Sequence, residues 1–252
     1  MTVRKRLKGF SKNKRSLFKD EEETNYGKIV LLGDAGVGKT SLIDRMANNS
    51  FTEHYNPTAI TSIVNAKILI GQNDQVNEHY TSRINHNFNI LNNKNTAKSS
   101  LETTRIKGHK DRYCCFQFVN TNADITHVAP VTYRATVANV KGVILVCAFD
   151  KSDSLKHLKE MYNSVHSITG KVDIPVVIAA NKCDLKNTKI SVDEIMRVAE
   201  ELGVGYCMIS AASSNGCGNL IQLLLNALQS KSETTEDIFY KDKKKDENCV
   251  IM

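Results

Sequence analysis

The chain has 252 residues, of which 41% are hydrophobic and 24% charged, and its net charge is +7 at neutral pH. This composition is ordinary for a soluble globular protein, and the length allows one large core with extended ends. The sequence contains no run of about 18 apolar residues, so we expect no transmembrane helix. The seven cysteines lack metal-ligand spacing, so we expect free thiols rather than a disulfide framework.

The N-terminal segment is strongly basic. Residues 1–19 contain eight lysines and arginines and no acidic residue, so the remaining 233 residues have a net charge of −1. The segment has no continuous apolar core and is not expected to be a secretory signal. We interpret 1–25 as a basic N-terminal extension, for which three roles stay open. It is a disordered leader, an amphipathic segment for an anionic membrane, or a nucleic-acid-directed basic run.

Residues 33–40 fit the pattern G-x-x-x-x-G-K-[ST] at every fixed position. In such a P-loop the backbone N–H groups surround phosphates, Lys39 would reach the β- and γ-phosphates, and the Thr40 hydroxyl would ligate Mg²⁺. The short apolar run 28–32 predicts the strand that this motif needs before it, and apolar spacing over 40–48 predicts the helix after it. A chance match in a glycine-rich turn is the alternative. The predicted phosphate-binding set is Gly33, Asp34, Ala35, Gly36, Val37, Gly38, Lys39, Thr40 and Ser41.

A polar loop with a proline follows this helix over 51–58, and 61–70 reads as a strand. Residues 71–110 hold eight asparagines and no sustained apolar period. A compact domain rarely contains so long a structureless loop, so we interpret 71–110 as a surface insertion, with a small, poorly patterned subdomain as the alternative.

Alternating strands and helices follow the insertion. We expect a strand at 112–119 antiparallel to the preceding one, and a capping box at Ser191 that opens a helix ending at 202. Strands alternating with helices predict a mostly parallel sheet covered on both faces, with ligands at the carboxyl ends of the strands. The remaining expected strands are 143–149, 175–180 and 206–209, and the remaining expected helices are 154–169 and 219–229.

A second motif, Asn181-Lys182-Cys183-Asp184, comes directly after the 175–180 strand. An aspartate in such an N-K-x-D loop accepts hydrogen bonds from guanine N1–H and the 2-amino group. Adenine offers neither donor and would leave the carboxylate unpaired. Asn181 would hold the loop and meet the base edge, and the stem of Lys182 would pack over the base. The motif therefore predicts a guanine site and disfavours an ATP-using P-loop kinase.

The P-loop and the N-K-x-D motif together resemble the Ras superfamily of small GTPases over roughly 26–230, apart from the insertion. The resemblance implies that Phe51 packs against guanine and that the switch I residue Thr58 completes Mg²⁺ coordination when a γ-phosphate is present. It also implies an effector region that includes Tyr55, Pro57 and Thr58. Ser210-Ala211-Ala212 corresponds to the family's Ser-Ala-Lys loop, whose backbone meets the guanine oxygen. Because Ala212 lacks the lysine stem, we expect weaker nucleotide affinity with retained specificity.

The chain departs from the family where switch II begins. The family has Asp-Thr-Ala-Gly-Gln-Glu, whereas residues 120–125 read Asn-Thr-Asn-Ala-Asp-Ile. Asn120 brings no negative charge to the metal, Ala123 loses the freedom of a glycine, and Asp124 replaces the glutamine that orients the attacking water. We therefore expect poor intrinsic hydrolysis, although Asp124 acting as a general base is an alternative.

The last four residues, Cys249-Val250-Ile251-Met252, form a C-terminal C-a-a-X box, and the terminal Met favours farnesylation of Cys249. The polar tail 231–252 contains Lys241, Lys243, Lys244 and Lys245 and would make the cysteine accessible. One lipid chain anchors only marginally, so a second signal such as the basic extension is expected. A chance terminal cysteine is the alternative.

These features predict an α/β protein with the three-layer P-loop NTPase fold and a six-stranded, mostly parallel sheet with one antiparallel edge strand. The expected function is a guanine-nucleotide switch in signalling or vesicle trafficking that binds GTP or GDP with Mg²⁺ and hydrolyses GTP weakly. It is expected at the cytoplasmic face of a plasma or internal membrane. The rival is a pseudo-GTPase that binds GTP without turnover and acts as a membrane scaffold. Effector and exchange-factor proteins are expected partners, and nucleic acid is not.

Overall fold

A computed structural model of the chain describes residues 27–54, 56–58, 60–70, 112–122, 130–170, 174–231 and 239–241. The basic N-terminal extension and the insertion 71–110 lie outside the described residues, as does most of the polar tail. No helix among the described residues is both long enough and apolar enough to span a bilayer.

The described residues form one seven-stranded sheet. Its main path has the order β2-β3-β1-β4-β5-β6, and a short strand, β7, pairs with β3 outside that path. Strands β1, β3, β4, β5 and β6 run parallel to one another, whereas β2 and β7 pair with β3 antiparallel. The strands are β1 (Gly27–Leu32), β2 (Ser62–Ile70), β3 (Arg112–Asn120), β4 (Gly142–Ala148), β5 (Val176–Asn181), β6 (Gly205–Met208) and β7 (Phe239–Lys241).

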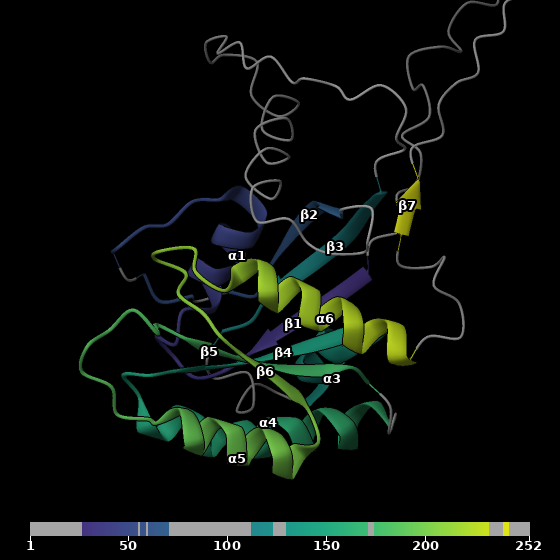
Figure 1. The fold of residues 1–252 in the computed structure, drawn as a ribbon. Helices are drawn as coiled ribbons and strands as arrows, with labels where there is room; N and C mark the ends of the chain where they lie inside the picture. Colours follow the sequence, from purple (N-terminus) through teal and green to yellow (C-terminus); the bar gives the residue numbers. More distant parts are fainter. Residues whose placement is uncertain are drawn as a thin grey trace, which may run out of the picture.

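Five helices cover the two faces of the sheet within the described ranges. Figure 1 shows α1 and α6 on one face and α3, α4 and α5 on the other. The helices are α1 (Lys39–Asn48), α3 (Pro130–Val137), α4 (Ser152–Thr169), α5 (Val192–Leu202) and α6 (Cys217–Lys231).

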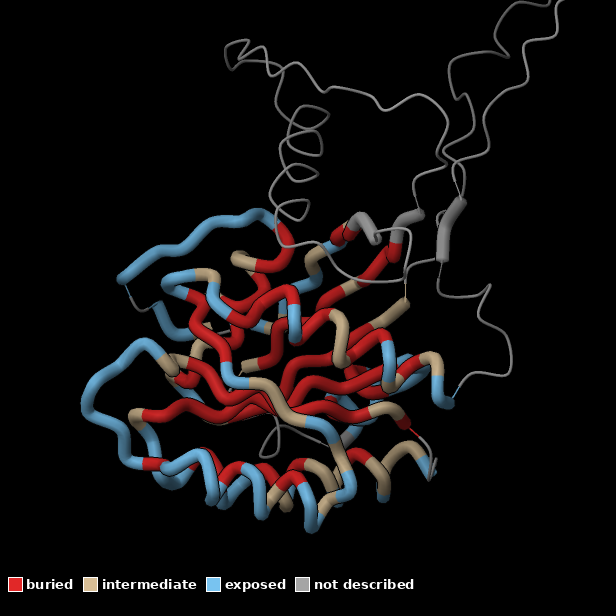
Figure 2. The backbone as a smooth tube through the Cα atoms, viewed as in Figure 1, coloured by how far each residue is buried: buried red, intermediate tan, exposed pale blue. Residues whose placement is uncertain are grey.

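The central strands consist of buried residues, as Figure 2 shows. Side chains alternate along a strand, so neighbours contribute to opposite layers of core. In β1, Ile29 and Leu31 pack with α1 and α6, whereas Val30 and Leu32 pack with α3, α4 and α5. This two-sided burial explains why the strands of the sheet centre read as continuous apolar runs in the sequence.

The predicted fold class is confirmed, including the antiparallel edge strand β2. The capping box is confirmed too. The Ser191 hydroxyl accepts from the Glu194 N–H (3.2 Å), and the Glu194 carboxylate accepts from the Ser191 N–H (2.7 Å). Two elements were not predicted, α3 and β7. Four of the eight residues of α3 are valine or threonine, which favour strands over helices, and β7 is only three residues long within a polar tail.

The sheet brings the predicted motifs to one edge. The P-loop follows β1, Asn120 ends β3, the Asn-Lys-Cys-Asp motif begins at the end of β5, and the loop from Ser210 follows β6. The carboxyl ends of parallel strands share one edge of the sheet, and this is where ligands bind in such folds. β7 pairs with the first three residues of β3 and therefore lies at the opposite end.

Candidate functional site

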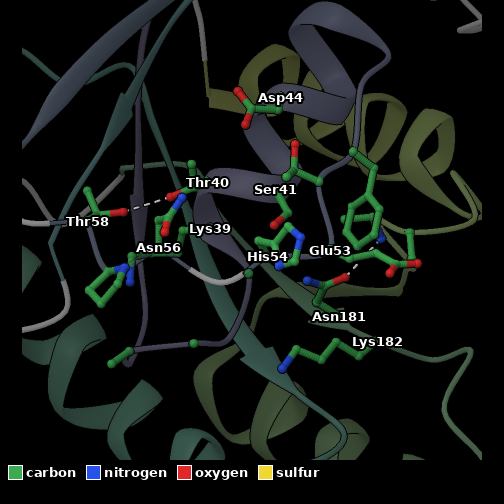
Figure 3. A pocket seen from close by; sticks show the side chains of 18 of the residues that line it. Lys39, Thr40, Ser41, Asp44, Glu53, His54, Asn56, Thr58, Asn181 and Lys182 are labelled. Atoms are coloured by element: carbon green, nitrogen blue, oxygen red, sulfur yellow. Dashed lines mark hydrogen bonds between the residues drawn. The ribbon is translucent and has the colours of Figure 1, made fainter.

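A pocket of about 660 Å³ opens at this edge, a volume typical of small-molecule sites. Figure 3 shows Lys39, Thr40 and Thr58 toward one end of it and Asn181 and Lys182 toward the other. Glu53 and His54, which were not in the predicted set, also line it. The predicted residues in its lining are Ala35, Gly36, Gly38, Lys39, Thr40, Ser41, Phe51, Pro57, Thr58, Asn181, Lys182, Asp184, Ala211 and Ala212.

The P-loop backbone requires glycine at two positions. Gly38 has φ +94°, and a Cβ there would lie 2.3 Å from Asn181 Nδ2. Gly33 has φ +156°, and a Cβ there would lie 2.2 Å from the carbonyl oxygen of Val146. Gly38 is also the N-cap of α1 and supplies no side-chain cap, so the first turn of α1 offers its N–H groups and its positive dipole end to an anion.

Lys39 is 6% exposed, and its ammonium group donates to the carbonyl oxygens of Gly33 (2.6 Å) and Asp34 (3.0 Å). These bonds hold the cation across the inside of the loop, next to the start of α1. A cation and a helix N-terminus side by side favour a multiply charged anion such as a polyphosphate.

Three polar side chains meet at the Lys39 end of the pocket. The hydroxyls of Thr40 and Thr58 are hydrogen-bonded at 2.8 Å although the residues come from α1 and the switch I loop. Asn120 Nδ2 donates to Thr40 Oγ1 at 3.0 Å, while its Oδ1 is buried with no hydrogen-bond partner. An unpaired buried oxygen beside two hydroxyls fits a bound Mg²⁺ or a water in its shell. The oxygen atoms that Thr40, Thr58 and Asn120 offer as metal ligands are neutral. The described residues contain no cluster of three or more His, Cys, Asp or Glu side chains suited to a metal ion.

Asn181 connects the P-loop to the loop after β6. Its Nδ2 donates to the Val37 carbonyl (2.9 Å), and its Oδ1 accepts from the Ala211 N–H (3.1 Å). The side chain is 2% exposed, so both bonds are shielded from water. These contacts match the predicted role of Asn181 in holding the loop, because they fix the position of the motif relative to both neighbouring loops.

Lys182 adopts a left-handed conformation (φ +65°) and pairs with Asp150 (Nζ–Oδ2 2.7 Å). The Cys183 N–H donates to the Ile209 carbonyl at 3.0 Å. The 181–184 loop is thus held by the loops after β4 and β6, with Asp184 in the pocket lining.

Two side chains that were not predicted hold the P-loop from outside. Lys151 Nζ donates to the Ala35 carbonyl (2.5 Å). His157 Nδ1 lies 2.9 and 3.1 Å from the two carboxylate oxygens of Asp34. This hydrogen bond to Asp34 raises the pKa of His157, and nearby Glu160 and Asp153 act in the same direction. No sequence signal identifies these contacts, since each joins residues more than 100 positions apart.

Several predicted residues fall outside the pocket or outside the described residues. Gly33, Asp34, Val37, Asn120 and Ser210 support the loops without being in the pocket lining. The described ranges do not include Tyr55, Ala123, Asp124 and Cys249.

Two family models match the chain. The model described as "Ras family" matches residues 128–230, and the model described as "Ras of Complex, Roc, domain of DAPkinase" matches 28–88. The two matches lie on either side of the segment that contains part of the insertion and the altered motif at 120–125.

Curated relatives align over most of the chain. The chain is 25% identical over 205 residues to GTP-binding protein Di-Ras1 of Homo sapiens, covering 81% of this chain and 82% of the relative. It is 25% identical over 240 residues to GTP-binding protein Di-Ras2 of Mus musculus, covering 92% and 99%. It is 22% identical over 217 residues to Ras-related protein RabC of Dictyostelium discoideum, covering 86% and 90%. Taken with the fold and the P-loop edge of the sheet, these matches support a Ras-superfamily small GTPase, because the chain is similar to GTP-binding proteins of that superfamily over most of its length.

Proposed function

We propose that this protein is a membrane-associated guanine-nucleotide switch that binds GTP and GDP with Mg²⁺ and hydrolyses GTP slowly. The observation that carries the proposal is one pocket lined by the P-loop, Phe51 and the 181–184 motif together. The P-loop by itself is compatible with any nucleoside triphosphate. The aspartate of the second motif selects guanine, because Asp184 can pair with two donors that adenine lacks.

Phosphates are bound at the end of the pocket that contains Lys39 and the first turn of α1. The ammonium group of Lys39 and the backbone N–H groups of 34–40 would offset the phosphate charge. Thr40 and Thr58, with the Asn120 oxygen behind them, would hold Mg²⁺. When bound, the metal balances the charge of the β- and γ-phosphates.

Slow hydrolysis follows from residues 120–124. By resemblance to the family, Asp124 replaces the glutamine that orients the attacking water, and a carboxylate in place of that glutamine would repel the γ-phosphate. Asn120 provides no negative charge to the metal site, although its buried oxygen remains available to accept a hydrogen bond. Phosphate binding by this chain therefore rests on Lys39 and the P-loop amides, while activation of water is impaired.

A second candidate is a pseudo-GTPase that keeps GTP bound without turnover and serves as a membrane scaffold. The side chains Thr40, Thr58 and Asn120 at the proposed metal site are neutral, which favours this candidate. The intact P-loop and 181–184 motif would preserve nucleotide binding, whereas the altered residues at 120–124 would impair hydrolysis. In either case effectors would bind the segment 51–64 and the region after Asn120. Within 51–64, Ile60 and Ile63 expose 81% and 59% of their surface.

The test is to purify the full chain, identify the nucleotide that co-purifies, and follow single-turnover loss of GTP with Mg²⁺. We expect bound guanine nucleotide and GDP that forms slowly. GTP that stays intact would replace the switch with the pseudo-GTPase. Absence of guanine nucleotide, together with failure to bind added GTP in competition with ATP, would overturn both.

The Lys39→Ala variant tests the phosphate site directly. We expect it to lose nucleotide during purification, since the buried cation beside the phosphates is removed. The matched control is Lys156→Ala, which removes a lysine from the solvent-exposed surface of α4, where its side chain is 76% exposed. Nucleotide retained by Lys39→Ala at the level of the control would contradict the assignment.

A further inference from the structure

Arg45 lies in the last turn of α1 and contacts the loop that follows β6, 166 positions away in the sequence. Its Nε donates to the Ala211 carbonyl at 2.8 Å, and its Nη2 donates to the Ala212 carbonyl at 2.9 Å. A guanidinium group presents donors in a rigid planar fork, so one side chain can bind two adjacent carbonyls and fix their relative position.

The same guanidinium also faces the aromatic residue at the start of switch I. Arg45 Cζ lies 5.9 Å from the centroid of the Phe51 ring, within the range of a cation–π contact. Phe51 is 37% exposed, which leaves ring surface available to a base. Arg45 therefore contacts two segments from opposite halves of the chain. Both line the end of the pocket where the proposed function places guanine, here called the base end.

A purely local role is the competing explanation. Arg45 Nη1 donates to the Asn49 carbonyl (3.0 Å) and to Asn49 Oδ1 (3.2 Å), as a basic side chain at a helix C-terminus often does. That role uses only Nη1. It does not account for the two bonds to Ala211 and Ala212, which stabilise a loop outside α1.

The 211–212 backbone depends on a small number of side chains. Ala212 is exposed and has no side chain beyond Cβ, where the family has a lysine. Arg45 holds the two carbonyls, and Asn181 accepts from the Ala211 N–H. We propose that Arg45 is a positioning residue for guanine: it holds the 211–212 backbone and the Phe51 ring together around the base, and thereby slows nucleotide release.

This inference rests on the proposed function, because it assumes that guanine occupies the base end of the pocket. The experiment compares release of fluorescent GDP from the wild-type protein, Arg45→Ala and Arg45→Lys. We expect roughly 10- to 100-fold faster release from Arg45→Ala, since charge-assisted hydrogen bonds are lost. Arg45→Lys should stay close to Arg45→Ala, because a single ammonium group cannot reproduce the fork. Arg197→Ala, an exposed arginine on α5, is the matched control and should release GDP at the wild-type rate.

A readout of base recognition separates positioning from a general loss of stability. The 211–212 backbone is expected to meet the 6-oxygen of guanine, so Arg45→Ala should weaken GDP more than the diphosphate of 2-aminopurine riboside, which lacks that oxygen. A double-mutant cycle of Arg45→Ala with Phe51→Ala should give release rates that are not multiplicative.

Three outcomes would overturn the inference. These are wild-type release from Arg45→Ala, full rescue by Arg45→Lys, or an equal loss of affinity for both nucleotides accompanied by a lower melting temperature. Failure of the wild-type protein to bind GDP at all would instead overturn the proposed function, which keeps the two failures distinct.

Discussion

Asn120 differs from an aspartate by one charge, and its position next to Thr40 gives that difference a physical consequence. Its amide nitrogen donates to the Thr40 hydroxyl oxygen, which is the same oxygen that would bind Mg²⁺. A carboxylate at this position would accept a hydrogen bond from Thr40 and leave the hydroxyl oxygen free for the metal. We therefore expect the hydrogen bond from Asn120 to weaken Mg²⁺ binding at Thr40.

We predict that Asn120→Asp increases Mg²⁺ affinity in the presence of GDP by about tenfold, because a negative charge is added beside a hard cation. The measurement is GDP release as a function of free Mg²⁺, with EDTA as the zero point. Asn65→Asp, on the exposed part of β2, is the control for adding a charge elsewhere. An unchanged Mg²⁺ dependence would contradict the assignment of Asn120 to the metal site.

His157 and Asp34 give the P-loop a pH-dependent support. Because the hydrogen bond to Asp34 raises the pKa of His157, the charged form is favoured in the folded protein. The resulting stabilisation is fully present below the ordinary histidine pKa of about 6.5 and is lost as the pH rises through the raised folded-state pKa.

We expect wild-type stability relative to a His157→Gln variant to fall as the pH rises from about 6 to about 8.5, measured by urea unfolding. The difference should be a few tenths of a kcal/mol, since the His157 side chain is 47% exposed and water screens the pair. An NMR titration of His157 with a pKa at or below its ordinary value would contradict the pairing with Asp34.

At the level of secondary structure, the parallel strands β1, β3, β5 and β6 each lead into a loop of the site, and β7 is different. β7 is only three residues long, pairs antiparallel with β3, and does not reach the pocket edge. It pairs with Arg112, Tyr113 and Cys114 at the start of β3, where β1 does not reach, because the first β1 partner on β3 is Phe116. The C-terminal tail is therefore attached to the sheet at the end opposite the pocket.

We predict that truncation of the chain after residue 238 increases amide hydrogen exchange at residues 112–114 and leaves residues 116–119 protected. The reason is that β7 supplies the missing neighbour only for the first three residues of β3, whereas β1 and β2 cover the rest. Unchanged exchange at 112–114 would mean that β7 does not pair with β3 in solution. Loss of protection along the whole strand would mean that the tail supports the sheet more widely.

At the scale of the whole molecule, the pocket and the two ends of the described chain lie at opposite ends of the sheet. The pocket lies at the carboxyl edge of the sheet. The described chain begins with β1 and ends with β7 at the other end of the sheet. The basic N-terminal extension and the C-terminal segment therefore connect to the fold on the side away from the pocket. This arrangement supports the proposal that both segments contact one membrane while the 51–64 segment stays accessible to partners.

We predict that Cys249→Ser moves the protein from membrane to soluble fractions in cells. Replacing the eight basic residues of 1–19 with glutamine should weaken membrane binding less, in a manner that depends on salt, since one lipid chain and a basic segment contribute separately. The measure is fractionation with a salt wash from about 0.1 to about 0.5 M, a range over which charge screening strengthens. A Cys249→Ser protein that remains on membranes would contradict the lipid anchor, and salt-independent binding would contradict the basic one.

The sequence by itself determined the features that are formed by residues close together in the chain. The P-loop, the 181–184 motif and the apolar runs each depend on hydrogen-bond donors, turns or side-chain periods within a few residues, so local patterns were sufficient to indicate the fold class and the family. The helix α3 was not predicted, because its β-branched residues do not favour a helix locally. Burial of Tyr133 and Val137 against the sheet and α4 stabilises the helix in the folded protein.

Tertiary structure decided the contacts between segments far apart in the chain. Arg45 contacts Ala211, His157 contacts Asp34, and β7 pairs with β3 because the folded structure brings these distant segments together. No local pattern encodes such pairs, because the free energy that selects them comes from burying the faces of α1, α4 and α6 on the sheet. The nucleotide motifs could thus be read from the sequence, whereas the side chains that hold them in position could not.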